Sequence, residues 1–318
     1  MNFNKIVFFH GHVNGDCFQS RIIVNHIINI TKHLNIEYCY TATRALSSHS
    51  LDLNILDENF NKYSVENYNS PCYIKDNILY IHVWIGLYNI LKCTLCLKDI
   101  IKNYNLLIQE INNITDLNIT FIPEDTYPYL NFNYSYYDCN FLQNFINNNK
   151  KVYSKIILIF NLVPSTFYSL SFDHSFYLNK LAIKYPNYLF ITFNDQNLNY
   201  KNIISIKKIY DLNNKDLPIS FGIQFSYLSL LADKVLLLPT GPSLFCVNNN
   251  NIQNKFLIFL DIGTNKNPYN TVHCQDINYH DKLLCTSKFN WNINVLKLNS
   301  DAFDHNYITN YIDDFIVN

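Results

Sequence analysis

The sequence predicts an α/β protein built from two domains of similar size. Short apolar runs typical of buried strands alternate with longer segments of helical periodicity, which is the pattern of parallel sheets covered by helices. This pattern occurs twice, before and after a polar stretch at 147–151. The length of 318 residues also suits two domains of ordinary size. We therefore expect an N-terminal domain over 1–150 and a C-terminal domain over 151–318.

The first half opens with a strand, a loop and a helix. Residues 4–9 form an apolar run, and apolar residues spaced by three and four over 18–30 then indicate an amphipathic helix. The run 4–9 is too short for a signal peptide, so we expect a cytoplasmic protein whose nine cysteines are reduced thiols. Further strands are expected at 37–40, 78–85 and 118–122, and further helices at 88–112 and 141–147.

The second half repeats this order from residue 155 onwards. Strands are expected at 155–160, 188–193, 203–206, 234–238 and 256–260, and helices at 173–184, 217–231 and 301–315. The repetition indicates two Rossmann-like domains that face a central cleft, with the last helix a candidate to pack back on the N-terminal domain. No apolar run is long enough for a transmembrane helix.

Composition and motifs exclude several classes of function. A formal net charge of -1 argues against a protein that coats nucleic acid. The sequence has no G-x-G-x-x-G dinucleotide fingerprint and no P-loop. It also lacks the Gly-x-Ser-x-Gly and His-Glu-x-x-His motifs. NAD enzymes of that type, P-loop ATPases, α/β-hydrolases and zinc proteases are therefore not supported.

The loop at 10–16 (HGHVNGD) carries the first candidate site residues. Ligands of open α/β sheets bind outside the carboxyl ends of the strands, where this loop is expected. Asp16 stands at the first turn of a helix, where it either caps backbone N–H groups or acts as a general base. His10 and His12 are expected to line the same site. We expect no metal there, because no third ligand is identifiable.

Two more residues of the first half have a functional and a structural interpretation. Trp84 ends the predicted strand 78–85, and its ring is either a platform for a sugar or a core side chain with a satisfied indole N–H. Arg21 follows Asp16 by five residues. It is either a cation for a departing phosphate group or an ordinary solvated arginine on the helix.

Two loops of the second half contain residues that suit phosphate groups. The segment 239–243 (PTGPS) follows the apolar strand 234–238. Its glycine allows close approach of a ligand to the backbone, and its hydroxyls can donate to phosphate, although an ordinary turn is the alternative. After the strand 155–160, Asn161, Ser165 and Thr166 can also form hydrogen bonds to phosphate.

Two of these segments resemble a known family. Residues 231–243 (LADKVLLLPTGPS) look like the C/A-D-x-V-(apolar)-x-S/T-G-P segment of heptosyltransferase-like GT-B glycosyltransferases. Residues 10–16 are similar to the N-terminal Gly-Asp loop of these enzymes. The resemblance implies two Rossmann-like domains and inverting transfer of a sugar from a nucleotide-sugar donor, without a metal or another cofactor.

The resemblance also implies roles for individual residues. Asp16 matches the catalytic base, and the acceptor is expected near His10, His12 and Trp84. The sequence departs from the family at Pro239, where an Asp or Ser is usual, and it lacks the phosphate-binding lysine expected after the first C-terminal strand. The residues expected to bind the donor are Asn161, Ser165, Thr166, Thr240, Gly241, Pro242 and Ser243.

These observations predict a glycosyltransferase of carbohydrate biosynthesis. Its expected partners are a nucleotide-sugar donor and a glycan or another hydroxyl acceptor, and nucleic acid is not expected. One alternative is a non-catalytic sugar- or nucleotide-binding protein on a GT-B frame, which Pro239 and the missing lysine favour. Another is a nucleotide-sugar epimerase, which would need further carboxylates or histidines around the sugar.

Overall fold

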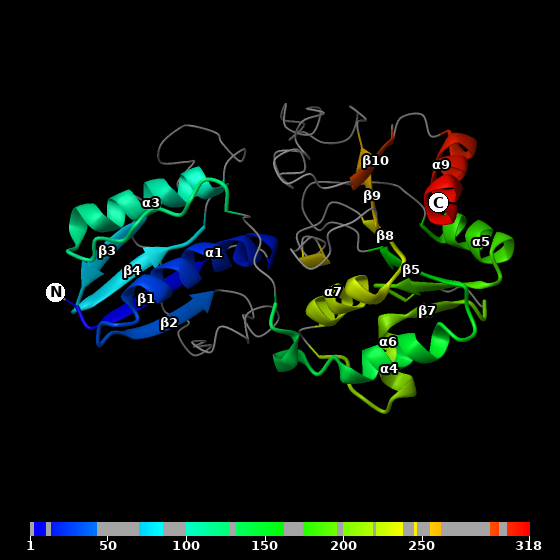
Figure 1. Ribbon diagram of the computed structural model, residues 1–318, viewed down its shortest axis with the longest axis horizontal. Helices are drawn as coiled ribbons and strands as arrows, with labels where there is room; N and C mark the ends of the chain where they lie inside the picture. Colours follow the sequence, from blue (N-terminus) through cyan, green and yellow to red (C-terminus); the bar gives the residue numbers. More distant parts are fainter. Residues whose placement is uncertain are drawn as a thin grey trace. The chain divides into compact units, whose positions relative to one another are not determined.

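The computed structural model divides the chain into two compact units, Met1–Tyr136 and Tyr137–Asn318 (Figure 1). Both units are α/β with parallel strands, which confirms the predicted fold class, while the central cleft stays a prediction. The structure describes residues 3–10, 14–42, 70–84, 100–126, 132–161, 174–195, 200–218, 221–237, 245–246, 255–261, 293–298 and 304–318.

The boundary between the units lies earlier than residue 150. Helix α4 (Asn140–Asn149) packs against α7 (Phe221–Leu231) of the second unit. Between them, Tyr227 Oη donates to Gln143 Oε1 at 3.0 Å. The polar run at 147–151 therefore joins α4 to the next strand of the same unit. Its polarity belongs to the end of a helix rather than to a linker between domains.

The first unit contains a four-stranded sheet in the order β2-β1-β4-β3. Strand β1 pairs in parallel with β2 and β4, and β3 pairs antiparallel with β4. The hairpin turn of β3 and β4 uses Asp76 and Asn77, whose φ angles of 51° and 59° suit a two-residue turn. The sequence did not predict β3. The elements are β1 (Lys5–His10), α1 (Asn14–Thr31), β2 (Glu37–Ala42), β3 (Cys72–Lys75), β4 (Ile78–His82), α3 (Ile100–Ile114) and the 3-10 helix η3 (Tyr134–Tyr137).

The predicted strand at 118–122 does not form. The backbone groups of this segment are bound by side chains of α3 instead. Asn112 Oδ1 accepts the N–H of Ile119 and its Nδ2 donates to the carbonyl of Ile119, both at 2.8 Å. Asn105 binds the N–H and the carbonyl of Ile122 in the same way, at 2.8 and 2.9 Å. The two amides replace a neighbouring strand, so the segment lies along the helix.

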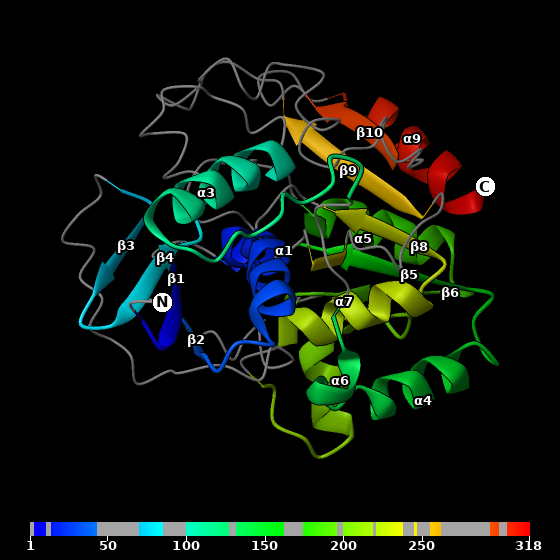
Figure 2. The same ribbon diagram turned by 60° about the vertical axis from the view of Figure 1, so that its left-hand side comes forward.

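The second unit contains a six-stranded sheet in the order β10-β9-β8-β5-β6-β7, and all pairings are parallel. Its five predicted strands are confirmed, and β10 and α6 are additions that the sequence did not predict. Helix α7 covers one face and α5 the other (Figure 2). The elements not yet given are β5 (Lys155–Phe160), α5 (His174–Lys184), β6 (Tyr188–Thr192), β7 (Ile203–Ser205), α6 (Ile206–Leu212), β8 (Lys234–Leu237), β9 (Phe256–Asp261), β10 (Ile293–Leu298) and α9 (His305–Val317).

The last helix, α9, packs on the core of the second unit. Its buried residues Ile308, Ile312, Phe315 and Ile316 share one apolar cluster with residues of β5 and α5. Each such side chain contributes about 1.5–3 kcal/mol when it leaves water. The last helix is therefore an amphipathic helix that covers its own sheet, and its packing on the N-terminal domain stays a prediction.

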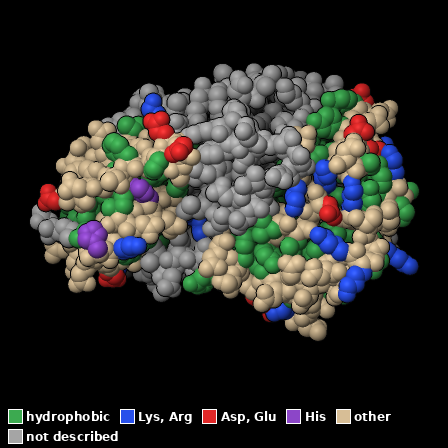
Figure 3. Space-filling view, viewed as in Figure 1, with side chains coloured by type: hydrophobic (Ala, Val, Ile, Leu, Met, Phe, Trp, Pro, Cys, Tyr) green, Lys and Arg blue, Asp and Glu red, His purple; other side chains and the backbone are tan. Residues whose placement is uncertain are grey.

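Charge is unevenly distributed between the two units. In the view of Figure 3, lysine and arginine side chains are denser over the second unit, at the right, than over the first. Several lysines of the second unit lie over aromatic rings, for example Lys180 over Phe176 at 4.3 Å and Lys234 over Phe315 at 4.7 Å. Such contacts retain the positive charge at the surface while the aliphatic part of the side chain covers a ring.

Candidate functional site

The order of strands in the second unit reverses between β5 and β8. From β5 the chain winds outward to β6 and β7, and it then returns to β8 and continues to β9 and β10 on the other side. This is the 3-2-1-4-5-6 order of doubly wound sheets, which bind ligands outside the carboxyl ends of the strands at the reversal. Asn161 directly follows β5 at this point. The segment 239–243 follows β8 in the sequence and lies outside the described residues.

Asn161 joins the ends of β5 and β6. Its side chain is buried, with an exposed fraction of 3%. The Asn161 Oδ1 accepts the N–H of Asn194 at 2.7 Å, and its Nδ2 donates to the Asn194 carbonyl at 3.3 Å. The amide thus continues the pairing of two strands beyond their ends. It holds the backbone at the reversal point, while direct binding of a donor by Asn161 stays a prediction.

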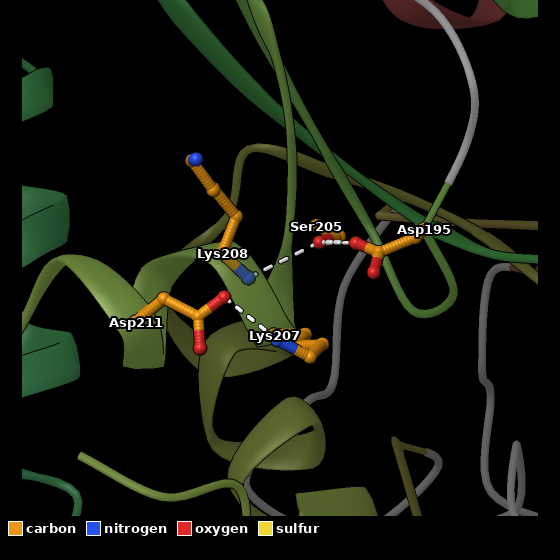
Figure 4. Close-up of polar contacts among 5 residues, drawn as sticks. All are labelled: Asp195, Ser205, Lys207, Lys208 and Asp211. Atoms are coloured by element: carbon orange, nitrogen blue, oxygen red, sulfur yellow. Dashed lines mark hydrogen bonds and ion pairs between the residues drawn. The ribbon is translucent and has the colours of Figure 1, made fainter. Parts of the chain in front are cut away.

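Asp195 lies at the same edge, after β6, the second strand in chain order. Ser205 Oγ donates to Asp195 Oδ1 and accepts the N–H of Lys208 at 3.2 Å (Figure 4). Ser205 is also the N-cap of α6. The Asp195 side chain is exposed, so one carboxylate oxygen is held in place while the group remains accessible. One turn into α6, Lys207 pairs with Asp211 at 2.8 Å.

Sequence reasoning missed Asp195 because it searched for glycine-rich and hydroxyl-rich loops. The available signal was an acidic residue directly after the second strand of a β/α/β unit. To place Asp195 beside the reversal point, one also needs the strand order, which shows that β6 is next to β5.

The first unit has a corresponding reversal between β1 and β4, at the carboxyl ends of these strands. His82 ends β4 and is buried, with an exposed fraction of 3%. Its Nδ1 accepts the backbone N–H of Trp84 at 3.3 Å, which leaves the proton of the neutral ring on Nε2. The His82 ring packs edge-on against Phe9 at 4.8 Å and Trp84 at 6.4 Å. Trp84 itself is half-buried.

Three predicted residues of the first unit belong to this edge. His10 ends β1, Asp16 lies in the first turn of α1, and Trp84 follows β4. For His10 and Asp16 the structure describes the backbone only. The other predicted residues lie outside the described part of the chain: His12, Ser165, Thr166, Thr240, Gly241, Pro242 and Ser243.

Arg21 is a buried residue of α1, with an exposed fraction of 2%. Its guanidinium lies 4.7 Å from the centre of the Phe132 ring. The expectation of a solvated helix arginine is therefore wrong. A cation held against an aromatic ring inside the first unit contributes to packing through a cation–π contact.

The described residues show neither a metal cluster nor a membrane-spanning helix. Among them, no three His, Cys, Asp or Glu side chains gather as a metal site would require. None of the helices in the described ranges combines the length and apolar character needed to span a membrane.

Comparisons with known proteins gave structural similarity alone. No protein-family model matches the sequence, and no curated protein matches it. The chain is similar to the structure of E. coli heptosyltransferase WaaC with ADP, at a TM-score of 0.48 and 6% identity, covering 98% of this chain and 99% of that one. It is also similar to a glycosyl transferase family 9 protein from Veillonella parvula DSM 2008, at a TM-score of 0.46 and 11% identity, covering 98% and 89%.

Proposed function

We propose that this chain is a glycosyltransferase that moves a sugar from a nucleotide-sugar donor to a hydroxyl acceptor, with inversion and without a bound metal. The observation that carries the proposal is the strand order of the second unit. It brings Asn161 to the reversal point and Asp195 to the end of the adjacent strand. Doubly wound sheets bind the phosphates and the ribose of nucleotides at these two places. The strand order supports nucleotide binding, and the sequence resemblances at 10–16 and 231–243 support the transfer of a sugar.

In the second unit, the donor is held by neutral groups and one carboxylate. The carboxylate of Asp195 accepts hydrogen bonds from the ribose hydroxyls. Ser205 keeps this carboxylate in one orientation by donating a hydrogen bond to it. The hydroxyls of Thr240 and Ser243 and the backbone beside Gly241 receive the phosphates. Hydroxyls and backbone N–H groups can stabilise a departing diphosphate because they are oriented before the reaction.

In the first unit, Asp16 acts on the acceptor. Its carboxylate takes the proton of the acceptor hydroxyl as the oxygen forms a bond to the anomeric carbon. The bond from that carbon to the phosphate oxygen breaks, and the nucleoside diphosphate leaves with the electron pair. Trp84 offers its ring to the apolar face of the acceptor sugar. The backbone N–H of Trp84 donates to His82 Nδ1, and this hydrogen bond holds the backbone at Trp84 in place.

The first test is a thermal-shift screen with nucleoside diphosphates and nucleotide sugars, with and without EDTA. A ligand that binds only the folded protein raises Tm in proportion to RT ln(1 + [L]/Kd). We expect one nucleotide to raise Tm equally with and without EDTA. The shift should be lost in Asp195→Ala and retained in Asp211→Ala, which removes a nearby exposed carboxylate of α6.

The screen separates the proposal from its alternatives. If no nucleotide shifts Tm, the donor site in the second unit is wrong. A shift that requires divalent metal would contradict metal-independent binding. If a nucleotide sugar binds but no sugar is transferred to any hydroxyl acceptor, the chain is a non-catalytic binding protein. Interconversion of the sugar without transfer would identify an epimerase.

A further inference from the structure

We propose that the amino edge of the sheet in the second unit docks on the surface of an anionic phospholipid bilayer. This inference is independent of sugar transfer. The edge, named here the lysine edge, is formed by the starts of the parallel strands and by the chain next to them. Its lysines are Lys150, Lys151, Lys155, Lys184, Lys201, Lys234 and Lys255.

Backbone positions place these lysines at one edge. Lys155 and Lys234 are the first residues of β5 and β8, which are neighbours in the sheet. Lys255 directly precedes β9. Lys201 precedes β7, and its carbonyl accepts a hydrogen bond from Tyr153 Oη at 3.2 Å. Lys184 ends α5 at the same end of the unit.

Much of the positive charge at the lysine edge is not cancelled by carboxylates. The Lys155 Nζ donates to the carbonyls of Ile316 and Val317, and Lys255 Nζ donates to the carbonyl of Leu230 at 3.2 Å. Carbonyls are neutral acceptors, so these hydrogen bonds do not cancel the charge of either lysine. An ion pair of this region joins Lys184 to Asp313.

The lysines also repel one another. Burial and the nearby Lys155 lower the pKa of Lys234, although Asp233 opposes the change. Burial likewise lowers the pKa of Lys255, with Lys150 adding to the effect and Asp233 opposing it. Among the described residues, the acidic groups around the edge are Asp233, whose carboxylate accepts the N–H of Ile156 at 2.7 Å, Asp313 and the exposed Asp314. An anionic surface would relieve this repulsion.

Exposed aliphatic side chains at the edge favour lipid over nucleic acid. Val152 is 74% exposed and Ile183 is 64% exposed. Val152 precedes Ser154 by two residues, and Ile183 lies in the last turn of α5, four residues before Asn187. The N–H of Ser154 donates to the Asn187 carbonyl at 2.8 Å, which joins these two segments. Aliphatic groups surrounded by lysines suit the boundary between headgroups and acyl chains. Proteins that bind single-stranded nucleic acid present aromatic rings to the bases instead.

Two aromatic rings of this region are already stacked on each other. Tyr185 and Tyr188 lie 5.0 Å apart in a parallel stack, and both are half-buried. Docking through the lysine edge also leaves the carboxyl edge accessible. A strand of about six residues, with a rise of about 3.3 Å per residue, separates the two edges by roughly 20 Å.

The test is flotation of the full chain with phosphatidylcholine vesicles that do or do not contain a third of phosphatidylglycerol. A lysine near an anionic surface contributes about fivefold to binding, so Lys150→Gln/Lys151→Gln/Lys201→Gln should weaken binding about 100-fold. The control Lys207→Gln/Lys208→Gln/Lys215→Gln removes the same charge from other parts of the unit and should bind within a few-fold of the wild type. Val152→Ser/Ile183→Ser should weaken binding several-fold at unchanged charge.

Three results would overturn the proposal. Equal binding to vesicles with and without phosphatidylglycerol would exclude recognition of anionic lipid. Equal losses in the two triple variants would show that net charge, rather than this edge, is responsible. Tight binding to a single-stranded RNA homopolymer without binding to either vesicle would assign the edge to nucleic acid. Circular dichroism of each variant checks that the substitutions, all at exposed positions except the half-buried Lys215, leave the fold intact.

Discussion

The carboxyl edges of the two units have the same topological origin and different chemistry. Each lies where the chain order of the strands reverses beside the first strand of its unit. In the first unit the described side chains at this edge include an imidazole and an indole ring, those of His82 and Trp84. In the second they are an amide, a carboxylate and a hydroxyl, Asn161, Asp195 and Ser205. The topology of the two edges is therefore equivalent and their side chains differ, which is why the proposed function assigns the acceptor sugar to one edge and the nucleotide to the other.

The units also differ in how their sheets are covered. The second unit has one large apolar cluster that joins β5, β6, β8, α5 and α9. In the first unit a cluster of four buried residues, Val7, Phe9, Cys39 and Tyr80, lines one face of the sheet. Each of the following predictions changes one unit and uses the other, or a matched position, as its reference.

The largest expected effect is that of Asp16→Asn in the first unit. Loss of a general base lowers turnover by about 100- to 10,000-fold, because the hydroxyl proton no longer has an acceptor as the bond forms. Nucleotide binding by the second unit should stay within twofold. Asp125→Asn, an exposed carboxylate of the same unit, serves as control. The role of Asp16 would be wrong if the kcat of Asp16→Asn stayed within threefold of the wild type.

Asn161→Leu should disturb the carboxyl edge of the second unit. The N–H of Asn194 loses its partner, which costs about 1–3 kcal/mol of unfolding free energy measured in urea. Nucleotide affinity should fall as well, because the loop after β6 is released. The matched variant is Asn202→Leu, since Asn202 Nδ2 donates to the carbonyls of Ala182 and Tyr185 at 3.1 Å, away from this edge. If both variants lose affinity equally, Asn161 has no special role at the site.

His82→Phe should affect the acceptor and leave the donor unaffected. Trp84 loses the acceptor of its backbone N–H, so the KM for the acceptor should rise about tenfold, equivalent to one hydrogen bond of about 1.4 kcal/mol. In a Trp291→Phe background, Trp84 is the remaining tryptophan, and its emission reports the change directly. A normal KM together with a shifted emission spectrum would show that His82 orders Trp84 but that Trp84 does not contact the acceptor.

The smallest expected effect concerns buried thiols. Burial, with Glu110 adding to it, raises the pKa of Cys72 in the first unit to about 12. Burial also raises the pKa values of Cys139 and Cys246 in the second unit to about 12. Above pH 9 the unfolded thiols ionise while the folded ones remain neutral, so the folded state binds more protons and stability falls as pH rises.

The expected loss is about 1 kcal/mol per thiol between pH 9 and pH 10, measured as a shift of the urea midpoint. Cys72→Ala should remove the loss of stability that comes from the first unit. Cys139→Ala should remove part of the loss that comes from the second unit. A pH dependence unchanged in both variants would assign the alkaline loss to other groups.

Local pattern was sufficient for most of the regular elements. The apolar runs of β1, β5, β6, β8 and β9 predict strands because buried parallel strands are apolar on both faces. The edge hairpin strand β3 was missed because half of its residues are exposed, and the strand predicted at 118–122 was wrong because two asparagines of α3 took its hydrogen bonds. Neither outcome can be read from periodicity, since both depend on which partner is nearby.

The sequence by itself determined the α/β class, two units, and candidate residues at the ends of strands, such as Asn161 and Trp84. These properties depend on neighbours along the chain. The tertiary structure decided the boundary before α4, the packing of α9 on its own sheet, the burial of Arg21, and the place of Asp195 beside the reversal point. Each of these depends on strand order and on contacts between residues far apart in the chain, which the hydrophobic pattern leaves open.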